Sequence, residues 1–543
     1  HIPTYVNRGS HTRVGTSFGL SHLEAGCAFC GACVDVCPTG ALWDKVSKWD
    51  GPPDGEARTT CPLCSLGCEL RLLVKDGAVI GALPGPGLPA LCVKGRFGIP
   101  ELVNHPDRLK HPLRIEHGEA VQVSWDEACQ LAAQRLVNCA PGDFALAASA
   151  GCSSEDLAAA CQFTRQVMRS DAAHLSAAAR YGRGLGAAAR LLALSQPLEA
   201  LDGADLILCL GLDATYAQSV VEPYLLRARA RGAALLTLNA REHVPGRFAD
   251  LWLKPPAGGE AALLEELAAG QAGGGEVGAA LRLLRAASRP LLLVGPAYLA
   301  DLPQAVERLQ AATGAGLAAL AAEGNLAGAL RARTGGALHA GFDGTPAPAP
   351  RVLYLVGAAL PPELEPETFV IFQNTHLPPG GWPPALRDGL VLPMAAFCEA
   401  EGSLVDHAGT LKPLCAAVAP PGEALPGWQI VCRIARAMGA QGFDFSSAQQ
   451  VSAGLPRQAA WTALPDGAPG WLARPGEHDF LGAPLANWVE GLRDLQPDPQ
   501  PDPHDPTGVL RDSQPDPHDP TGVLRDPQGV LREEGTHVLP AGE

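Results

Sequence analysis

The stretch 61-CPLCSLGCEL-70 contains three cysteines, and a fourth follows in 91-LCVKGRFG-98. Cys61, Cys64, Cys68 and Cys92 therefore have the spacing C-x2-C-x3-C-x23-C. Zinc ribbons usually bind their ion through two separate C-x2-C pairs. Three close thiols and one distant thiol suit a [4Fe-4S] cubane better. We therefore predict one complete [4Fe-4S] site from these four residues.

The segment between the third and fourth cysteines is predicted to form a β-hairpin. In 69-ELRLLVKDGAVIGAL-83, apolar and polar residues alternate on both sides of Asp76-Gly77. Alternation is typical of a strand, and Asp-Gly is typical of a tight turn. Lys94 follows Cys92 by two positions. That spacing leaves two interpretations open, a solvated surface lysine or a residue beside the cluster.

A second cysteine group occurs in 27-CAFCGACVDVCPTGAL-42. Its pattern, C-x2-C-x2-C-x3-C-P, is the bacterial ferredoxin run, in which the fourth cysteine binds the other cluster of a two-cluster domain. Cys27, Cys30 and Cys33 then need a fourth thiolate from a matching run, whose cluster Cys37 would serve. No such run precedes residue 27. We expect the missing ligands to come from a lost upstream segment or from a partner. A zinc site is the alternative, and the Cys-Pro ending argues against it.

Composition limits the classes of function. The formal net charge of −16 over 543 residues argues against a nucleic-acid groove, which needs clustered Lys and Arg. The sequence has no run of about eighteen apolar residues, so no membrane span is expected. Clustered cysteines in a large chain favour metal binding over disulfides, which indicates a cytoplasmic protein. The eight cysteines beyond residue 92 are expected to be small core residues.

The body of the chain alternates apolar runs with helical stretches. A capping box, Ser124 with Glu127, is expected to begin one helix. The pattern predicts an α/β fold with doubly wound parallel sheets, which bind ligands at the carboxyl ends of their strands. The expected strands are 144-FALAASAG-151, 204-ADLILCLGLDAT-215, 232-GAALLTLNARE-242, 290-PLLLVGPA-297, 351-RVLYLVGAA-359 and 368-TFVIFQNTH-376.

From about residue 7 to residue 440 the chain resembles the molybdopterin oxidoreductase superfamily. The resemblance rests on the second cysteine motif with 93-VKGRFGIPELVNHPDRLKHPLRI-115 and 123-VSWDEA-128. The ferredoxin segment is similar to the one joined to it in the large iron–sulfur subunit of NADH-quinone oxidoreductase and in the α subunit of NAD-linked formate dehydrogenase. In both relatives a [2Fe-2S] domain and another cluster segment come first. The resemblance thus implies an upstream segment that supplies the missing ligands.

The resemblance also implies a pterin-guanine dinucleotide at the strand ends. The loops with Gly211, Asp213 and Asn239 match two of the family's strand-end loops. In a catalytic member, Lys94 would lie between the cluster and the pterin. Formate dehydrogenases bind Mo or W through a Cys or selenocysteine followed by His. The matching segment, 171-DAAHLSAAARYGRG-184, has Ala179 and Arg180 there. Because a methyl group cannot bind a metal, Mo/W-molybdopterin chemistry is expected to be lost.

Two further departures point the same way. The segment 375-THLPPGGWPPALRDGLVLP-393 lacks the Thr-rich loop of the family, and the C-terminal part is too short for the β-barrel that closes over the pterins.

The repeat QPDPHDPTGVLRD near the end is typical of disorder. The expected domains are a partial ferredoxin-type segment (1–50), a β-rich 4Fe-4S domain (56–112), an α/β body (113–440), a C-terminal extension (441–494) and a disordered tail (495–543).

Three functions remain open. The first is an iron–sulfur electron-transfer subunit of an NADH-linked complex, similar to the large iron–sulfur subunit of NADH-quinone oxidoreductase, which lacks its own catalytic site. Its partners would be flavin/NADH-binding subunits and other iron–sulfur subunits. The second is a formate dehydrogenase α subunit-like Mo/W-bis-pterin oxidoreductase. The third is an assembly or structural paralogue with vestigial clusters. All eight cluster cysteines are present, which argues against the third.

Overall fold

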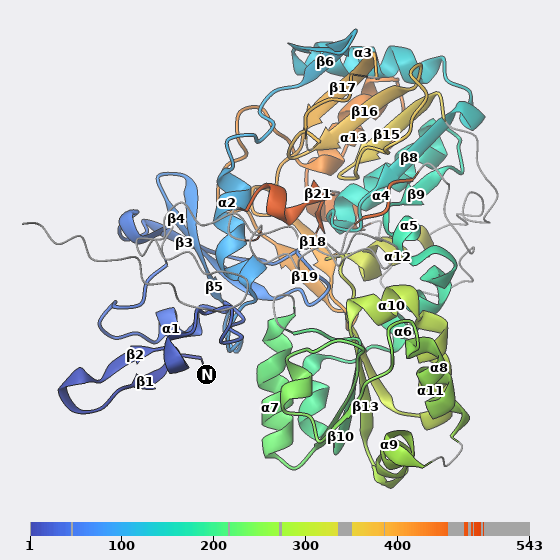
Figure 1. Cartoon of the computed structure of the whole chain (residues 1–543). Coiled ribbons are helices and arrows are strands. Elements are labelled where there is room, and N and C mark those ends of the chain that lie inside the picture. Colours follow the sequence, from blue (N-terminus) through green and yellow to red (C-terminus); the bar gives the residue numbers. More distant parts are fainter. Residues whose placement is uncertain are drawn as a thin grey trace, which may run out of the picture. The chain divides into compact units, whose positions relative to one another are not determined.

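The structure is a computed structural model, shown in Figure 1. Residues His1–Leu495 form one compact unit. The predicted tail at 495–543 lies outside the described residues. These are residues 2–44, 47–214, 218–270, 274–334, 350–378, 380–384, 386–453, 472–475, 479–481, 483–489 and 492.

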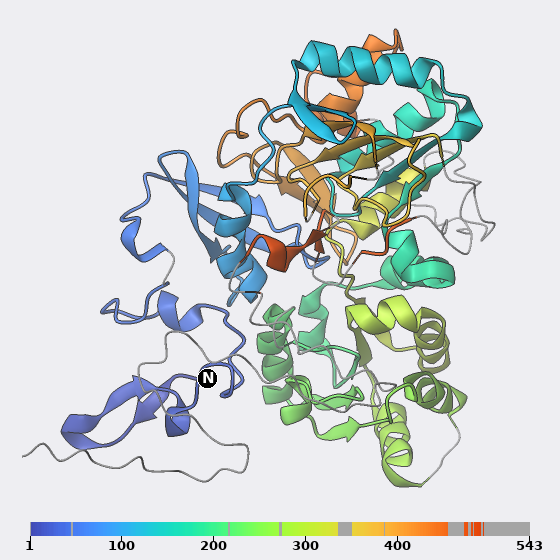
Figure 2. The same cartoon turned by 45° about the horizontal axis from the view of Figure 1, so that its top comes forward.

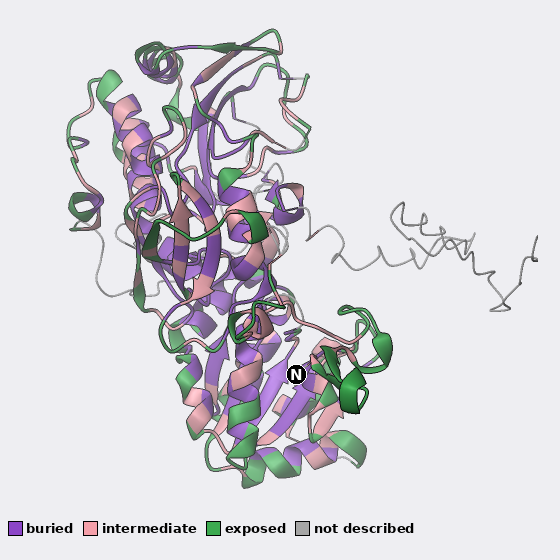
Figure 3. Ribbon diagram, turned by 90° about the vertical axis from the view of Figure 1, so that its left-hand side faces the viewer, coloured by how far each residue is buried: buried purple, intermediate pink, exposed green. Residues whose placement is uncertain are grey.

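The N-terminal segment is mostly exposed (Figure 3). Among described residues 2–44, only Gly31 is buried. The segment contains an antiparallel pair, β1 (Thr4–Val6) with β2 (Arg13–Gly15), and the short helix α1 (Ala32–Asp35). Its shape therefore depends on turns and on contacts with other parts of the chain more than on a core of its own.

The second cysteine motif frames a three-stranded antiparallel sheet. Its strands are β3 (Gly55–Thr60), β4 (Glu69–Lys75) and β5 (Ala78–Pro84). The predicted hairpin is confirmed, because β4 and β5 meet at Asp76 and Gly77, which have φ of 49° and 77°. A π-helical turn (Lys94–Gly98) and α2 (Ile99–Asn104) then pack against β5.

A seven-stranded sheet has the order β7-β6-β17-β16-β15-β8-β9. Five strands are parallel, and β6 and β7 form an antiparallel hairpin at one edge. The strands are β6 (Leu113–Glu116), β7 (Glu119–Gln122), β8 (Phe144–Ala148), β9 (Ala173–Leu175), β15 (Val352–Val356), β16 (Phe369–Asn374) and β17 (Asp388–Pro393). The associated helices are α3 (Trp125–Val137), α4 (Ser154–Gln162), α5 (Ala177–Tyr181), α13 (Gly427–Ala437) and α14 (Ala448–Ala453).

A five-stranded parallel sheet, of order β12-β11-β10-β13-β14, is inserted between β9 and β15. This order is that of a doubly wound fold, with the change of direction between β10 and β13. Figures 1 and 2 show α7 on one face and α8 and α11 on the other. The strands are β10 (Leu206–Leu210), β11 (Ala234–Leu238), β12 (Leu251–Leu253), β13 (Pro290–Val294) and β14 (Gly316–Ala319). The helices are α6 (Leu185–Leu194), α7 (Glu222–Ala230), α8 (Glu260–Ala269), α9 (Gly275–Ala286), α10 (Pro296–Asp301), α11 (Pro303–Thr313) and α12 (Leu326–Thr334).

The six strands expected in the α/β body are confirmed. Of the two hydrogen bonds of the predicted capping box, one forms. The Ser124 hydroxyl accepts a hydrogen bond from the Glu127 backbone N–H at 3.2 Å. The Glu127 carboxylate, however, pairs with Arg114 of β6 at 3.4 Å. Within the described ranges, no helix combines the length and apolarity needed to cross a bilayer.

A buried ion pair joins the segment after α2 to the loop after β17. Two nitrogens of Arg108 donate to the two carboxylate oxygens of Glu399, at 2.7 and 2.6 Å. Both side chains are 2% exposed. Glu399 also accepts from the backbone N–H of Ala396 at 2.6 Å. Removal of one charge would leave the other buried without its counter-ion, which is strongly destabilising.

We predict that Glu399→Gln lowers the free energy of unfolding by about 3–5 kcal/mol. The matched control is Glu265→Gln, which breaks an exposed pair with Arg308 and is expected to cost at most about 1 kcal/mol. Anaerobic urea titration of the three proteins, followed by circular dichroism, measures the difference. Equal losses in the two variants would show that burial of the Arg108 pair is not what stabilises this junction.

Candidate iron–sulfur site

The four cysteines of the second motif line one small cavity. Its other walls are apolar side chains and glycines: Leu63, Leu66, Gly67, Leu91, Gly95 and Val220. Burial raises the pKa of the thiols of Cys61, Cys64 and Cys68, and neighbouring sulfurs raise them further. Thiols in such surroundings are neutral until a cation neutralises their thiolates. An apolar chamber with four convergent sulfurs therefore fits a [4Fe-4S] cluster.

A single metal ion is the alternative to a cluster. In the part of the chain that the structure describes, no group of three His, Cys, Asp or Glu side chains is arranged to hold one metal ion. In a cubane each thiolate binds a different iron, so the four sulfurs stand farther apart than around one zinc ion. The sequence spacing of the four cysteines is compatible with a cubane.

Hydrogen bonds from distant parts of the chain hold the cysteine loop at 61–68. The Cys61 N–H donates to the carbonyl of Cys68 at 2.9 Å and closes the loop on itself. Ser65 forms two hydrogen bonds with the backbone of Ala321, just beyond β14, and its carbonyl accepts from the His407 N–H at 2.7 Å. His407 follows β18 (Gly402–Val405), which pairs with β19 (Leu411–Leu414). The loop is therefore positioned by both the five-stranded sheet and this hairpin.

Gly324 allows the α/β body to approach the cysteine loop closely. A Cβ at Gly324 would overlap the carbonyl of Pro62, the residue that follows the first cysteine of the loop. The φ of Gly324 is not in the left-handed region, so the constraint is the close approach itself. No motif in the sequence singled out this residue.

Lys94 is a buried residue, so the solvated interpretation of it is wrong. It is 3% exposed, and its Nζ donates to the Leu63 carbonyl at 3.4 Å. Burial raises the pKa of the Cys64 thiol, and the nearby Lys94 charge acts against that rise. The ammonium group is thus placed to stabilise negative charge in the cysteine cavity.

The structure brings three cysteines of the first motif together. Burial raises the pKa of Cys27 and Cys33, and Cys30 contributes to both shifts. The pKa of the Cys37 thiol shifts in the opposite direction. The Leu42 N–H lies 3.4 Å from its sulfur, and the Thr39 hydroxyl lies 3.7 Å from it. These contacts lower the pKa of Cys37 to about 7. The assignment of Cys37 to a different cluster stays a prediction.

Arg96 connects the two cysteine motifs, which the sequence did not indicate. It follows Cys92 by four residues, and its guanidinium donates to the Asp35 carboxylate of α1 at 2.6 Å. It also donates to the Ala82 carbonyl of β5 at 2.5 Å. The side chain is 6% exposed and fills the space where a Cβ at Gly31 would lie. One buried cation therefore ties the ferredoxin segment to the second motif.

The segment in which the resemblance predicts the loss of a metal ligand contains a charged pair. Ala179 lies in α5, and the Arg180 side chain pairs with Glu323 at 3.9 Å. These two side chains are 7% and 9% exposed. The Tyr181 hydroxyl also donates to Glu323 at 3.0 Å. The side chains of this segment thus offer no soft metal ligand and are engaged in an internal network.

The predicted pterin-loop residues Gly211, Asp213 and Asn239 lie at the carboxyl ends of β10 and β11, as expected. At the switch point, however, the ring of Tyr298 from α10 occupies the space where a Cβ at Gly211 would be. Tyr298 is 7% exposed. Asn239 accepts a hydrogen bond from the Arg241 N–H at 3.1 Å, within its own loop. Tyr298 thus packs against Gly211 at the switch point, where doubly wound folds bind ligands.

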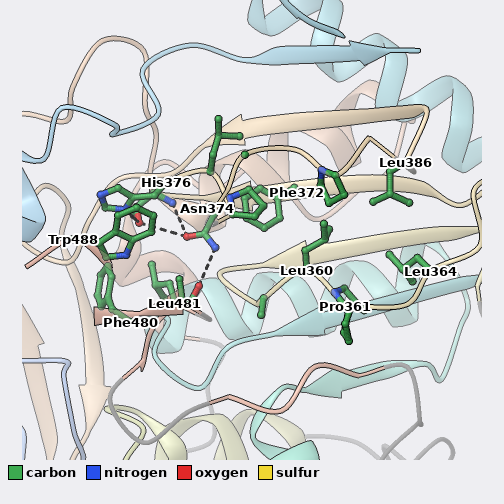
Figure 4. Close-up of a pocket in the computed structure, with 18 residues that line it drawn as sticks. Leu360, Pro361, Leu364, Phe372, Asn374, His376, Leu386, Phe480, Leu481 and Trp488 are labelled. Atoms are coloured by element: carbon green, nitrogen blue, oxygen red, sulfur yellow. Dashed lines mark hydrogen bonds between the residues drawn. The ribbon is translucent and has the colours of Figure 1, made fainter. Parts of the chain in front are cut away.

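The seven-stranded sheet has a larger cavity, of about 350 Å³, beyond β15 and β16 (Figure 4). A C-terminal segment lines it, and Trp488 stacks on His376 with ring centroids 4.2 Å apart. Burial is the main cause that lowers the pKa of His376 to about 3, so the ring is neutral. Asn374 donates to the Leu481 carbonyl at 3.0 Å. The residues at this strand edge are thus partly engaged by the chain's own C-terminal segment.

Comparison with known families agrees with this architecture. Residues 108–272 match the molybdopterin oxidoreductase model, and residues 55–105 match the molybdopterin oxidoreductase Fe4S4 domain. Residues 55–105 and 108–272 are thus similar to the molybdopterin oxidoreductase family. Residues 24–43 also match a 4Fe-4S binding domain. The family resemblance and the order of cluster-binding parts predicted from the sequence are confirmed.

Individual relatives of this chain have diverse names. An NADH-quinone oxidoreductase subunit of Rhizobium meliloti is 33% identical over 47% of this chain and 30% of the relative. F420-dependent formate dehydrogenase 1 subunit alpha of Methanococcus maripaludis is 31% identical over 38% of this chain and 32% of the relative. NADH-quinone oxidoreductase subunit 3 of Thermus thermophilus is 28% identical over 80% of this chain and 57% of the relative.

Among solved structures, acetylene hydratase from Pelobacter acetylenicus has a similar fold. Its TM-score is 0.55 at 16% identity, over 73% of this chain and 71% of that chain. The matched parts cover only about a third of the first two relatives named above. These similarities support the family and the fold, and they leave the whole protein's activity open.

We predict that Gly324→Val lowers the iron bound per polypeptide without altering any cysteine. The new side chain would displace Pro62 and move the thiols on either side of it. Gly142→Val is the matched control, because a Cβ at Gly142 meets nothing within 4 Å. Iron analysis of both variants after anaerobic purification measures the effect. Full iron content in Gly324→Val would show that the close approach does not position the cluster loop.

Proposed function

We propose that this chain is the iron–sulfur electron-transfer subunit of an NADH-linked oxidoreductase complex, similar in role to the large iron–sulfur subunit of NADH-quinone oxidoreductase. The observation that carries the proposal is a contrast within one chain. Four cysteines enclose an apolar cavity suited to a cubane, whereas the residue that the resemblance places at the family's metal-ligand position is Ala179. The ferredoxin segment supplies Cys27, Cys30, Cys33 and Cys37 as further ligands.

Residues of this chain would make the cluster sites suitable for electron relay. When bound, a [4Fe-4S] cluster accepts and releases one electron at a time. Apolar walls such as Leu66, Leu91 and Val220 exclude water from the sulfurs, and burial is one determinant of a cluster's potential. Lys94 offsets negative charge beside Cys64. Arg96 fixes the position of the ferredoxin segment and hence of the neighbouring cluster site.

A molybdenum or tungsten pterin does not fit the residues present at the catalytic position. A methyl group at Ala179 cannot bind the metal, and the Arg180–Glu323 pair has no soft donor atom. Tyr298 packs into the strand-order switch point beside Gly211. We therefore assign no reaction step to a pterin and treat the α/β body as a scaffold.

The names of the relatives indicate the kind of partners. Two relatives are NADH-quinone oxidoreductase subunits, so a multisubunit complex with flavin/NADH-binding and other iron–sulfur subunits is the expected setting. An upstream [2Fe-2S] segment would complete the relay, and the complex would be cytoplasmic or peripheral at the inner membrane. The second candidate function, a formate dehydrogenase α-like enzyme, is favoured by the similarity to the Methanococcus protein.

We predict that formate does not reduce the clusters. The complex, purified anaerobically with any upstream segment, is incubated with formate or with dithionite, and reduced clusters are counted by electron paramagnetic resonance. Dithionite is expected to produce the reduced-cluster signal and formate none, because Ala179 provides no metal ligand. Formate-dependent reduction by the purified complex would favour the second candidate. Absence of a dithionite-induced signal would contradict the electron-transfer proposal.

A further inference from the structure

The loop after β10 reaches from the five-stranded sheet to the cysteine cavity. Val220, in a 3-10 turn (Ser219–Val221), lines that cavity with the four cysteines. Gln218, immediately before the turn, is 1% exposed and has φ of 53°. A left-handed conformation is uncommon for a residue other than glycine, and it requires support from the surroundings. Gln218 is therefore held in a defined position beside the cluster site.

The amide group of Gln218 has an unused hydrogen-bond donor. Its Nε2 is buried and forms no hydrogen bond of normal geometry with the described residues. Val220, two residues further on, lines the cavity with Cys64, which places Gln218 beside that thiol. Burial raises the pKa of the Cys64 thiol, and the Gln218 side chain acts against that rise. A buried donor without an acceptor is destabilising. The Cys64 sulfur becomes such an acceptor when it is a thiolate bound to iron.

We propose that Gln218 donates a hydrogen bond to the Cys64 thiolate of the bound cluster and raises the cluster's reduction potential. Reduction adds one electron and makes the cluster and its thiolates more negative. The hydrogen bond strengthens as that charge grows, so it stabilises the reduced form more than the oxidised form. This inference rests on the proposed function, because it requires a cluster at Cys61, Cys64, Cys68 and Cys92.

The test compares two variants of the full chain in its complex. Gln218→Met keeps the length of the side chain and removes the donor. Ser219→Ala is the matched control, because Ser219 is also buried and its hydroxyl also lacks a hydrogen-bond partner among the described residues. Cluster potentials are measured by redox titration with paramagnetic resonance, after iron analysis. The signal of this cluster is identified by its loss in Cys64→Ser.

We expect Gln218→Met to make reduction about tenfold less favourable, a shift of about −59 mV for a one-electron couple. Ser219→Ala should leave the potential unchanged. An unchanged potential in Gln218→Met with full iron, or equal shifts in both variants, would overturn the inference. Absence of the cluster from the wild-type chain would instead refute the proposed function.

A second measurement needs no variant and applies if Gln218→Met fails to fold. The wild-type complex is labelled with [amide-15N]glutamine, and the reduced cluster is studied by pulsed paramagnetic resonance. We expect a 15N hyperfine coupling on the signal assigned to Cys64. A labelled wild-type cluster without this coupling would contradict the inference.

Discussion

The docking of the cysteine loop at 61–68 onto the α/β body is the constraint on which the cluster site depends. The loop cannot enclose a cavity alone, because its thiols need apolar walls on every side. Ser65 pairs with Ala321 at the end of β14, and Gly324 permits contact with Pro62. The loop is therefore held by segments far along the chain. Val220 completes the cavity wall from the loop after β10.

The sheet edge at which the resemblance predicts a dinucleotide contributes to the cysteine cavity in this chain. The carboxyl ends of β10 and β14 face the cysteine loop through Val220 and Ala321, whereas Tyr298 packs into the switch point. A parallel sheet places the ends of its strands at one edge, and the edge can serve a cluster as well as a nucleotide. The predicted loss of a metal ligand at Ala179 is then compatible with a stable body.

Local patterns in the sequence predicted local structure well. The hairpin at Asp76-Gly77 and the six strands were predicted correctly, because turn chemistry and apolar runs act over a few residues. The predicted capping contact of the Glu127 carboxylate was wrong, because this carboxylate pairs with Arg114. Spacing alone left the burial of Lys94 open, and it did not indicate the positions of Arg96 and Gln218. Each depends on a partner far along the chain, such as Asp35 for Arg96, and no spacing rule encodes that contact.

The central claim is that this chain relays electrons through iron–sulfur clusters and has no molybdenum or tungsten chemistry of its own. The most direct measurement is the content of iron, molybdenum and tungsten per polypeptide in the complex purified anaerobically. Iron at cluster stoichiometry, with neither molybdenum nor tungsten, is the predicted result. Stoichiometric molybdenum or tungsten bound to this chain would contradict the claim, because Ala179 and Arg180 could not account for its ligation.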